Sequence, residues 1–149
     1  MAESYPEKLI AEVIRLFPEY LKDPLDGERS GGNAAALALG PDGVVHGHVF
    51  GSDRERGQRV HLIASRKLMQ VWRTGYPTGR FEELIFAGKL DEAKFMIQRP
   101  DFIGWLGGVP LLSPQGEAVT AAFSGFRGFK DVEIIERAAQ AVGLKPKPL

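Results

Sequence analysis

The sequence predicts a single α+β domain in which helices cover an antiparallel sheet. Two pairs of short apolar runs flank tight turns, a pattern typical of β-hairpins, whose strands pair antiparallel. Longer stretches with apolar residues at helical spacing lie before, between and after these hairpins. The apolar side of each helix must be buried, and the sheet offers the surface for it. At 149 residues, the chain has the size of one domain.

The first helix is predicted over residues 5–17. Ser4 and Glu7 form a capping box at its start, and apolar residues then recur every three or four positions. Pro18 is expected to end or kink this helix, with at most a short continuation. Residues 23–32 are rich in turn formers and are therefore expected to form a loop.

The first hairpin is predicted from two apolar runs, residues 33–40 and 44–50, around the turn Pro41-Asp42-Gly43. A polar loop over residues 51–57 follows it. The next helix is predicted from about residue 58 to 74, because apolar residues again recur along one side. Trp72 belongs to that apolar side, and we expect it to be buried.

Two short helices are predicted after a glycine-rich and proline-containing break at residues 75–79. They cover residues 81–87 and 90–98 and end at Gly88 and before Pro100. Both are short because glycine and proline interrupt the helical pattern.

The second hairpin is predicted from residues 107–112 and 116–125, again around a proline- and glycine-containing turn. The last helix is predicted over residues 131–142, with a stripe of apolar side chains along it. The remaining tail, residues 145–149, is expected to be loose. The elements found in this way include four strands.

The composition excludes several classes of function. The chain has 19 basic and 19 acidic residues, so it lacks the positive charge expected of a domain that binds nucleic acid. No apolar run is long enough to cross a membrane, and the first residues do not resemble a secretory signal. The absence of cysteine excludes disulfides and thiolate metal sites. We expect a cytoplasmic protein with neither nucleic-acid nor membrane partners.

Histidines provide the first candidate site. His46 and His48 are two residues apart in a predicted strand, so both imidazoles point to the same face. They are suited to ligate a metal such as haem iron, or to act as a general acid–base pair. The alternative is that they sit on a solvent face. Gly47 leaves the opposite face open to a helix or flat ligand, and His61 follows on the next helix, close enough in sequence to approach them.

The loops provide further candidates. Asp53 and Arg56 lie just before the predicted second helix, where an arginine beside free N–H groups can hold a carboxylate or phosphate; alternatively, Asp53 caps the helix. Trp105 stands in a glycine-rich segment, either as the wall of a pocket or as a core anchor. The link from Ser124 to Asp131 carries Arg127, which could bind an acidic group. Alternatively, this link is a tight turn with both its phenylalanines packed inward.

Several short motifs occur in an order that is similar to the GlcG/HbpS-like family, which includes the C-terminal domain of PduO proteins. The resemblance covers about residues 33–143. The matching segments are Asp42-Gly43-Val44-Val45, Gly75-Tyr76-Pro77-Thr78, Gly107-Gly108-Val109-Pro110, Gly116-Glu117 and Ser124-Gly125. The family usually has Gly-Arg-Pro-Thr where this chain has Gly-Tyr-Pro-Thr. The resemblance implies a profilin-like α/β/α sandwich with about five antiparallel strands, homo-oligomers, and haem or corrinoid binding in several members.

Three hypotheses for the function follow. In the first, the protein binds haem or a related tetrapyrrole: His46 or His48 ligates the iron, Trp105 and Tyr76 form the walls, and Arg127 or Arg56 faces the propionates. In the second, it is a cofactor-independent lyase or isomerase for a small organic acid or aromatic substrate, with the same histidines as proton shuttles. In the third, it is a homo-oligomeric interaction module without a small ligand.

Overall fold

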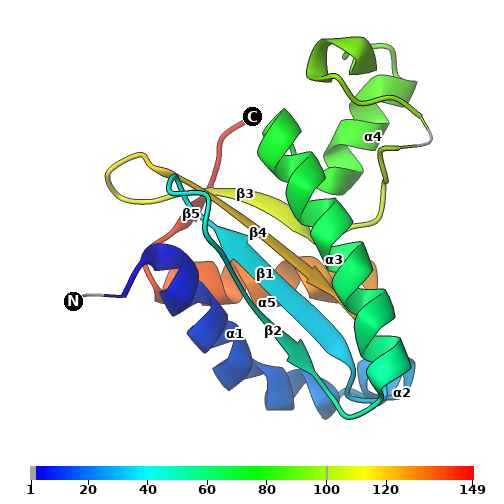
Figure 1. The fold of residues 1–149 in the computed structure, drawn as a ribbon, viewed down its shortest axis with the longest axis vertical. Helices are drawn as coiled ribbons and strands as arrows, with labels where there is room; N and C mark the ends of the chain where they lie inside the picture. The colour runs from blue at the N-terminus through cyan, green and yellow to red at the C-terminus, as the bar shows by residue number, and fades with distance from the viewer. Residues whose placement is uncertain (1–2, 100) are drawn as a thin grey trace.

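The computed structural model describes residues 3–99 and 101–149, which build a five-stranded antiparallel sheet between helices (Figure 1). The strand order is β2-β1-β4-β3-β5, and each predicted hairpin forms a neighbouring pair. The α+β class and the five-stranded antiparallel sheet are thereby confirmed. The strands are β1 (Ala34–Leu39), β2 (Val45–Phe50), β3 (Gly108–Leu112), β4 (Ala118–Ser124) and β5 (Lys145–Pro146).

The C-terminal tail is not loose, and this expectation was wrong. Lys145 and Pro146 pair with the outer edge of β3, and the Lys147 N–H donates to the Pro110 carbonyl at 2.9 Å. Leu144, immediately before, is buried and anchors the tail. Without β5, the outer carbonyls of β3 would have no strand partner.

Helices α1 (Tyr5–Leu21) and α5 (Gly128–Ala141) lie side by side on one face of the sheet, which we call the α1/α5 face. Helix α1 continues through Pro18 to Leu21. Phe17 fills the centre of this face and stacks on Phe50 with ring centroids 3.9 Å apart. This face holds the larger part of the hydrophobic core.

Helix α3 (Arg54–Thr74) crosses the opposite face, the α3 face, and is its main covering helix (Figure 1). It begins four residues before the predicted start because Asp53 caps it, its side chain accepting the Arg56 N–H at 3.1 Å. Trp72 is 57% exposed, so its predicted burial was wrong. Ala64, Leu68 and Val71, predicted for the same side of the helix, are buried.

The expected loop at residues 23–32 contains a short helix, α2 (Pro24–Ser30). Asp23 caps its start, Pro24 occupies the first helical position, and Gly31 ends it with a positive φ of 56°. Aspartate, proline and glycine are turn formers, but they are also the start and stop signals of helices. The prediction of a loop was therefore wrong.

A lobe lies at the C-terminal end of α3, where Figure 1 shows α4 (Thr78–Phe86) and the segment after it. The second short helix, predicted over 90–98, is reduced to a 3₁₀ turn at Glu92–Phe95 that ends at Met96 with a positive φ. Pro100, its predicted limit, lies outside the described residues. The lobe has its own small aromatic core around Phe81, Phe95 and Phe102.

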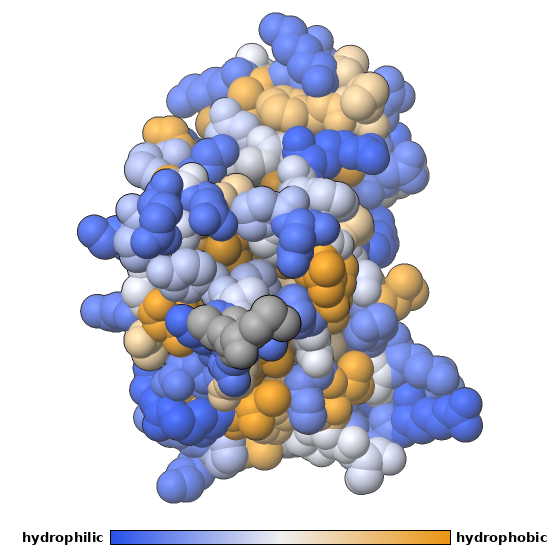
Figure 2. Space-filling model, turned by 60° about the vertical axis from the view of Figure 1, so that its left-hand side comes forward, coloured by the Kyte–Doolittle hydropathy of each residue, from blue (hydrophilic) through white to orange (hydrophobic). Residues whose placement is uncertain are grey.

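The surface is mostly polar. Figure 2 shows hydrophilic residues over most of one side of the molecule, with hydrophobic ones in small separate groups. Among the helices of residues 3–99 and 101–149, none combines the length and apolar character needed to cross a membrane.

Candidate functional site

A pocket of about 510 Å³ opens between α3, the end of α2 and the turn from β4 to α5. We call it the α3 pocket. Four of its lining side chains are basic and one is acidic, while the others are mainly apolar or glycine. The lining residues are Arg29, Arg56, Arg59, Val60, Ile63, Lys67, Trp105, Leu106, Ser124, Gly125, Phe126, Gly128 and Asp131.

Lys67 and Asp131 form a buried ion pair in this lining. The Lys67 Nζ donates to Asp131 Oδ2 at 3.3 Å and to the Phe123 carbonyl at 2.9 Å, and only 2% of its side chain is exposed. The other oxygen of Asp131 accepts the Phe126 N–H at 2.8 Å. Burial raises the pKa of Asp131 to about 7, although Lys67 opposes this, and burial lowers the pKa of Lys67. Burial thus shifts the pKa of each partner toward its neutral form, a perturbation that is typical of functional sites.

Gly107 allows the backbone to approach this pair closely. Its φ is 124°, and a Cβ atom there would lie 2.4 Å from the Phe123 carbonyl oxygen and 2.8 Å from Lys67 Nζ. Only glycine fits such a position without strain. The Gly-Gly-Val-Pro segment thus places a residue without a side chain next to the buried amine.

Trp105 forms part of the pocket wall and is 55% exposed, so it is not a core anchor. Its segment is fixed against α3 by Gln70, whose amide exchanges two hydrogen bonds with the Ile103 backbone, at 2.7 and 2.8 Å. The Thr78 hydroxyl also donates to the Trp105 carbonyl. The indole therefore presents a flat apolar surface on a well-supported backbone.

The arginines come from two elements that meet at the N-terminal end of α3. Arg56 on α3 donates to the Arg29 carbonyl at the end of α2, at 2.7 Å. Among the described residues, neither Arg29 nor Arg59 has an acidic side chain within ion-pair distance. Their charges therefore remain available to a bound anion.

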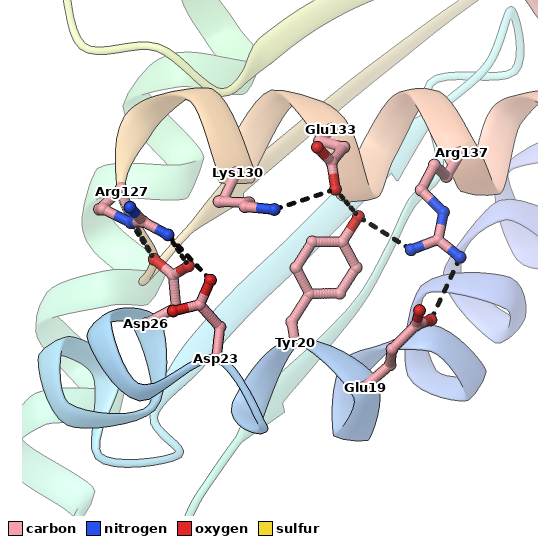
Figure 3. A network of polar contacts seen from close by, with 8 residues as sticks. All are labelled: Glu19, Tyr20, Asp23, Asp26, Arg127, Lys130, Glu133 and Arg137. Atoms are coloured by element: carbon pink, nitrogen blue, oxygen red, sulfur yellow. Dashed lines mark hydrogen bonds and ion pairs between the residues drawn. The ribbon is translucent and has the colours of Figure 1, made fainter.

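Helix α2 is held in place by Arg127, which does not line the pocket. Its guanidinium binds Asp23 at 3.0 Å and the fully buried Asp26 at 2.9 Å, and its backbone N–H also donates to Asp26 (Figure 3). Burial raises the pKa of Asp26, but the hydrogen bonds from Arg127 more than offset this, so that the pKa lies below its usual value. Arg127 is thus committed to fixing α2.

A second set of polar contacts in Figure 3 joins α1 to α5. The Tyr20 hydroxyl donates to Glu133 at 2.7 Å, and Arg137 binds both the Tyr20 oxygen and Glu19. Lys130 pairs with Glu133. Burial, together with the bond to Glu133, raises the pKa of Tyr20 to about 12. These side chains thus satisfy one another's hydrogen-bonding groups and charges at the rim of the α1/α5 face.

His46 and His48 share a face of β2, as expected, but it is the α1/α5 face. His48 is exposed and packs against Phe50 with ring centroids 4.5 Å apart; His46 is half-buried. The other side of Gly47 is not open, because the Leu37 side chain lies over it. The two imidazoles are therefore separated by the sheet from Trp105 and the α3 pocket.

The remaining residues that were predicted for the site lie in separate regions of the structure. Ser124, Arg56 and Trp105 meet in the α3 pocket, whereas Asp53 and His61 share a shallow hollow beside β2. His61 lies on the α3 side of the sheet and so does not approach His46 and His48. Tyr76 packs against Phe81 and Phe95 in the α4 lobe.

The β4–α5 link is partly as expected. Phe126 is buried, whereas Phe129 is 53% exposed, so only one of its phenylalanines packs inward. Phe129 instead lies under the Arg127 guanidinium at 4.7 Å.

Four residues of the pocket lining were not predicted as site residues from the sequence: Lys67, Arg29, Arg59 and Asp131. A signal for Lys67 was present, because it interrupts the buried stripe of α3 between Ala64 and Leu68. A lysine in that position must be buried and needs a partner. Arg29 left no such signal. Its place at the pocket depends on helix α2, and this segment was predicted to be a loop.

No family model matches the chain, and no curated protein matches it in sequence. Solved structures do match its fold. PduOC, solved in complex with haem, aligns with a TM-score of 0.69 at 12% identity, over 99% of this chain and 100% of that one. HbpS aligns with a TM-score of 0.62 at 14% identity, over 96% and 92%. The protein Ybr137w gives 0.57 at 16%, over 95% and 79%.

These likenesses span nearly the whole chain and confirm the resemblance at the level of the fold. The chain has the HbpS/PduO-like fold. At such low identity, the ligand of a neighbour does not transfer with the fold, so the ligand must be argued from the residues that line the α3 pocket.

Proposed function

We propose that this protein binds a small organic anion with a flat apolar body, such as a tetrapyrrole or a smaller aromatic carboxylate, in the α3 pocket. The observation that carries the proposal is the lining of this pocket, where four basic side chains and one acidic one surround an exposed tryptophan. Arginines bind carboxylates through paired hydrogen bonds, and an indole stacks on planar groups.

Haem fits this pocket only in part. Its propionates match the arginines, and its ring matches Trp105. The lining residues include no histidine, methionine, cysteine or tyrosine, the side chains that usually ligate haem iron. The proposal therefore concerns the carboxylates and the planar body of the ligand. It includes no bond between the protein and the iron.

The predicted iron ligands, His46 and His48, imply a different location for a bound haem. Because they lie on the α1/α5 face of β2, a haem held by them could not also contact Trp105 in the α3 pocket. Haem binding at these histidines therefore stays a separate prediction, with its own test.

The test is a titration with hemin, with metal-free protoporphyrin and with benzoate as the smaller aromatic carboxylate, each followed by the fluorescence of Trp105. Trp72→Phe leaves Trp105 as the only tryptophan, since the chain has two. We expect saturable quenching by all three compounds. Arg59→Ala should weaken binding by about tenfold or more, the effect of losing one charged hydrogen bond, whereas Arg54→Ala, at the hollow beside β2, should not.

Each other result has a distinct meaning. If neither tetrapyrrole nor benzoate quenches Trp105, the proposal is rejected. If only hemin binds, and its Soret shift is lost in His46→Ala or His48→Ala, the ligand is a haem on β2, as the histidine prediction states, and the α3 pocket is not its site.

A further inference from the structure

We propose that Lys67 is a nucleophilic amine that forms an imine with the carbonyl group of a small aromatic oxo acid or aldehyde acid bound in the α3 pocket. This inference rests on the proposed function, because the same pocket must first hold the carboxylate. It adds a reaction to what would otherwise be a binding site.

The first support is the position of the amine. Lys67 lies in the pocket lining, while its Nζ has two acceptors, the Phe123 carbonyl at 2.9 Å and Asp131 at 3.3 Å. A neutral amine uses its two N–H bonds for these acceptors, and its lone pair then points away from both. In the neutral form, these two contacts would hold the amine in one orientation and leave its electron pair for attack.

The second support is the missing side chain next to the amine. Gly107 presents only backbone to Lys67 Nζ, and a Cβ atom there would come within 2.8 Å of the nitrogen. A side chain at this position would press on the nitrogen that a substrate carbonyl has to reach.

The third support is the charge around the pair. Arg29 lies close enough to disfavour the charged form of Lys67, and burial acts in the same direction. Lysines are activated as nucleophiles by desolvation and by neighbouring cations. The arginines at the mouth of the pocket would hold the carboxylate of the substrate, which leaves its carbonyl to face inward.

The reaction is a condensation that needs no oxidant or reductant. The Lys67 lone pair attacks the carbonyl carbon, and the carbonyl oxygen takes a proton from the Asp131 carboxyl group, which gives a carbinolamine. The nitrogen then returns a proton to the Asp131 carboxylate, and the regenerated carboxyl group gives this proton to the hydroxyl group, which leaves as water. The products are one C=N bond to Lys67 and one water molecule, and Asp131 exchanges the protons.

The test uses phenylglyoxylate, which has an aromatic ring, a carboxylate and an adjacent carbonyl. The intact Trp72→Phe protein is incubated with it, reduced with borohydride, and mapped by peptide mass spectrometry. We expect one dominant reduced adduct on Lys67, suppressed by excess benzoate, which has no carbonyl to trap. The exposed Lys89 serves as the internal measure of unspecific labelling.

Two variants add a control to the mapping, which does not depend on them. Lys67→Arg keeps a cation next to Asp131 but removes the nucleophile, so the dominant adduct should disappear. Lys89→Arg should leave the adduct on Lys67 unchanged. If Lys67→Arg does not fold, the map of the wild-type side chain still decides the question.

The outcomes separate the two proposals. Quenching of Trp105 by phenylglyoxylate that is weakened in Arg59→Ala, with no adduct above background on Lys67, overturns the imine and leaves the proposed function standing. An adduct on Lys67 that is indifferent to Arg59 and to benzoate supports the nucleophile but rejects the anion site. Neither quenching nor adduct rejects both.

Discussion

The two faces of the sheet differ in how their polar groups are used. On the α1/α5 face, aromatic rings fill the interior, and the charged side chains at the rim pair with one another (Figure 3). On the α3 face, the apolar cluster is small, and polar side chains such as Lys67, Gln70 and Asp131 are buried next to a pocket. The α1/α5 face thus contains most of the apolar packing, whereas the α3 face combines a smaller apolar cluster with a pocket.

The covering helices explain this difference. Two helices share the α1/α5 face, so large side chains from both meet over the sheet. Helix α3 is the only long helix of the described residues on its face, and the space beside it is bounded by the Trp105 segment, the end of α2 and the turn from β4 to α5. A single helix cannot cover a five-stranded sheet, and the uncovered part is where a ligand can enter.

The largest expected effect is on the α1/α5 face. Phe17→Ala should lower the free energy of unfolding by about 3–5 kcal/mol, because it leaves a cavity among Phe50, Phe123 and Phe126. Urea unfolding measures the change. The matched Phe86→Ala, at a 60% exposed position, should cost less than about 0.5 kcal/mol. Equal costs at both positions would contradict the central place of Phe17 in the core of the α1/α5 face.

Arg127→Ala should have the next largest effect on the free energy of unfolding, and it should affect both faces of the sheet. It leaves the buried Asp26 without its guanidinium partner, which should cost about 2–3 kcal/mol, less than for a fully buried pair because Arg127 is partly exposed. It should also weaken binding of aromatic carboxylates, because α2 carries Arg29. Tryptophan fluorescence titration and urea unfolding measure the two effects. Unchanged affinity in a folded variant would show that α2 does not position the pocket.

A pH dependence should come from the α3 face. The pKa of Asp131 is raised to about 7 in the folded protein, above the ordinary value of 3.8, so that between about pH 4 and 7 the folded chain keeps a proton that the unfolded chain has lost. The contribution of Asp131 to the free energy of unfolding therefore falls as the pH rises through this window, by at most about 1.4 kcal/mol per pH unit.

Urea unfolding at several pH values, compared between the wild type and Asp131→Asn, measures this contribution. The difference between the two proteins should change across pH 4–7. Asp42→Asn, in an exposed turn, is the control and should run parallel to the wild type. A parallel curve for Asp131→Asn as well would show that the buried pair stays ionised throughout.

The fold was more predictable than the site, for a physical reason. Hairpins and helix stripes are local patterns, and the structure contains both predicted hairpins and the three main helices. Helix α2 was missed because the same residue types form turns and helix ends. The α3 pocket joins α2, α3 and the β4–α5 turn, whose contacts span much of the chain, and only Lys67 left a local trace, as a charge in an apolar stripe.

The histidines of β2 give the smallest expected effect. They also give the sharpest test of the division between the α1/α5 face and the α3 face. His46 and His48 point to the α1/α5 face, so His48→Ala should leave binding of protoporphyrin or benzoate in the α3 pocket unchanged. Its cost in unfolding free energy should stay near 0.5 kcal/mol, because the exposed ring contacts Phe50 only at its edge. The fluorescence of Trp105 reports the binding. A loss of affinity for metal-free ligands in His48→Ala would mean that the two faces are coupled through β2, because no iron is present to be ligated.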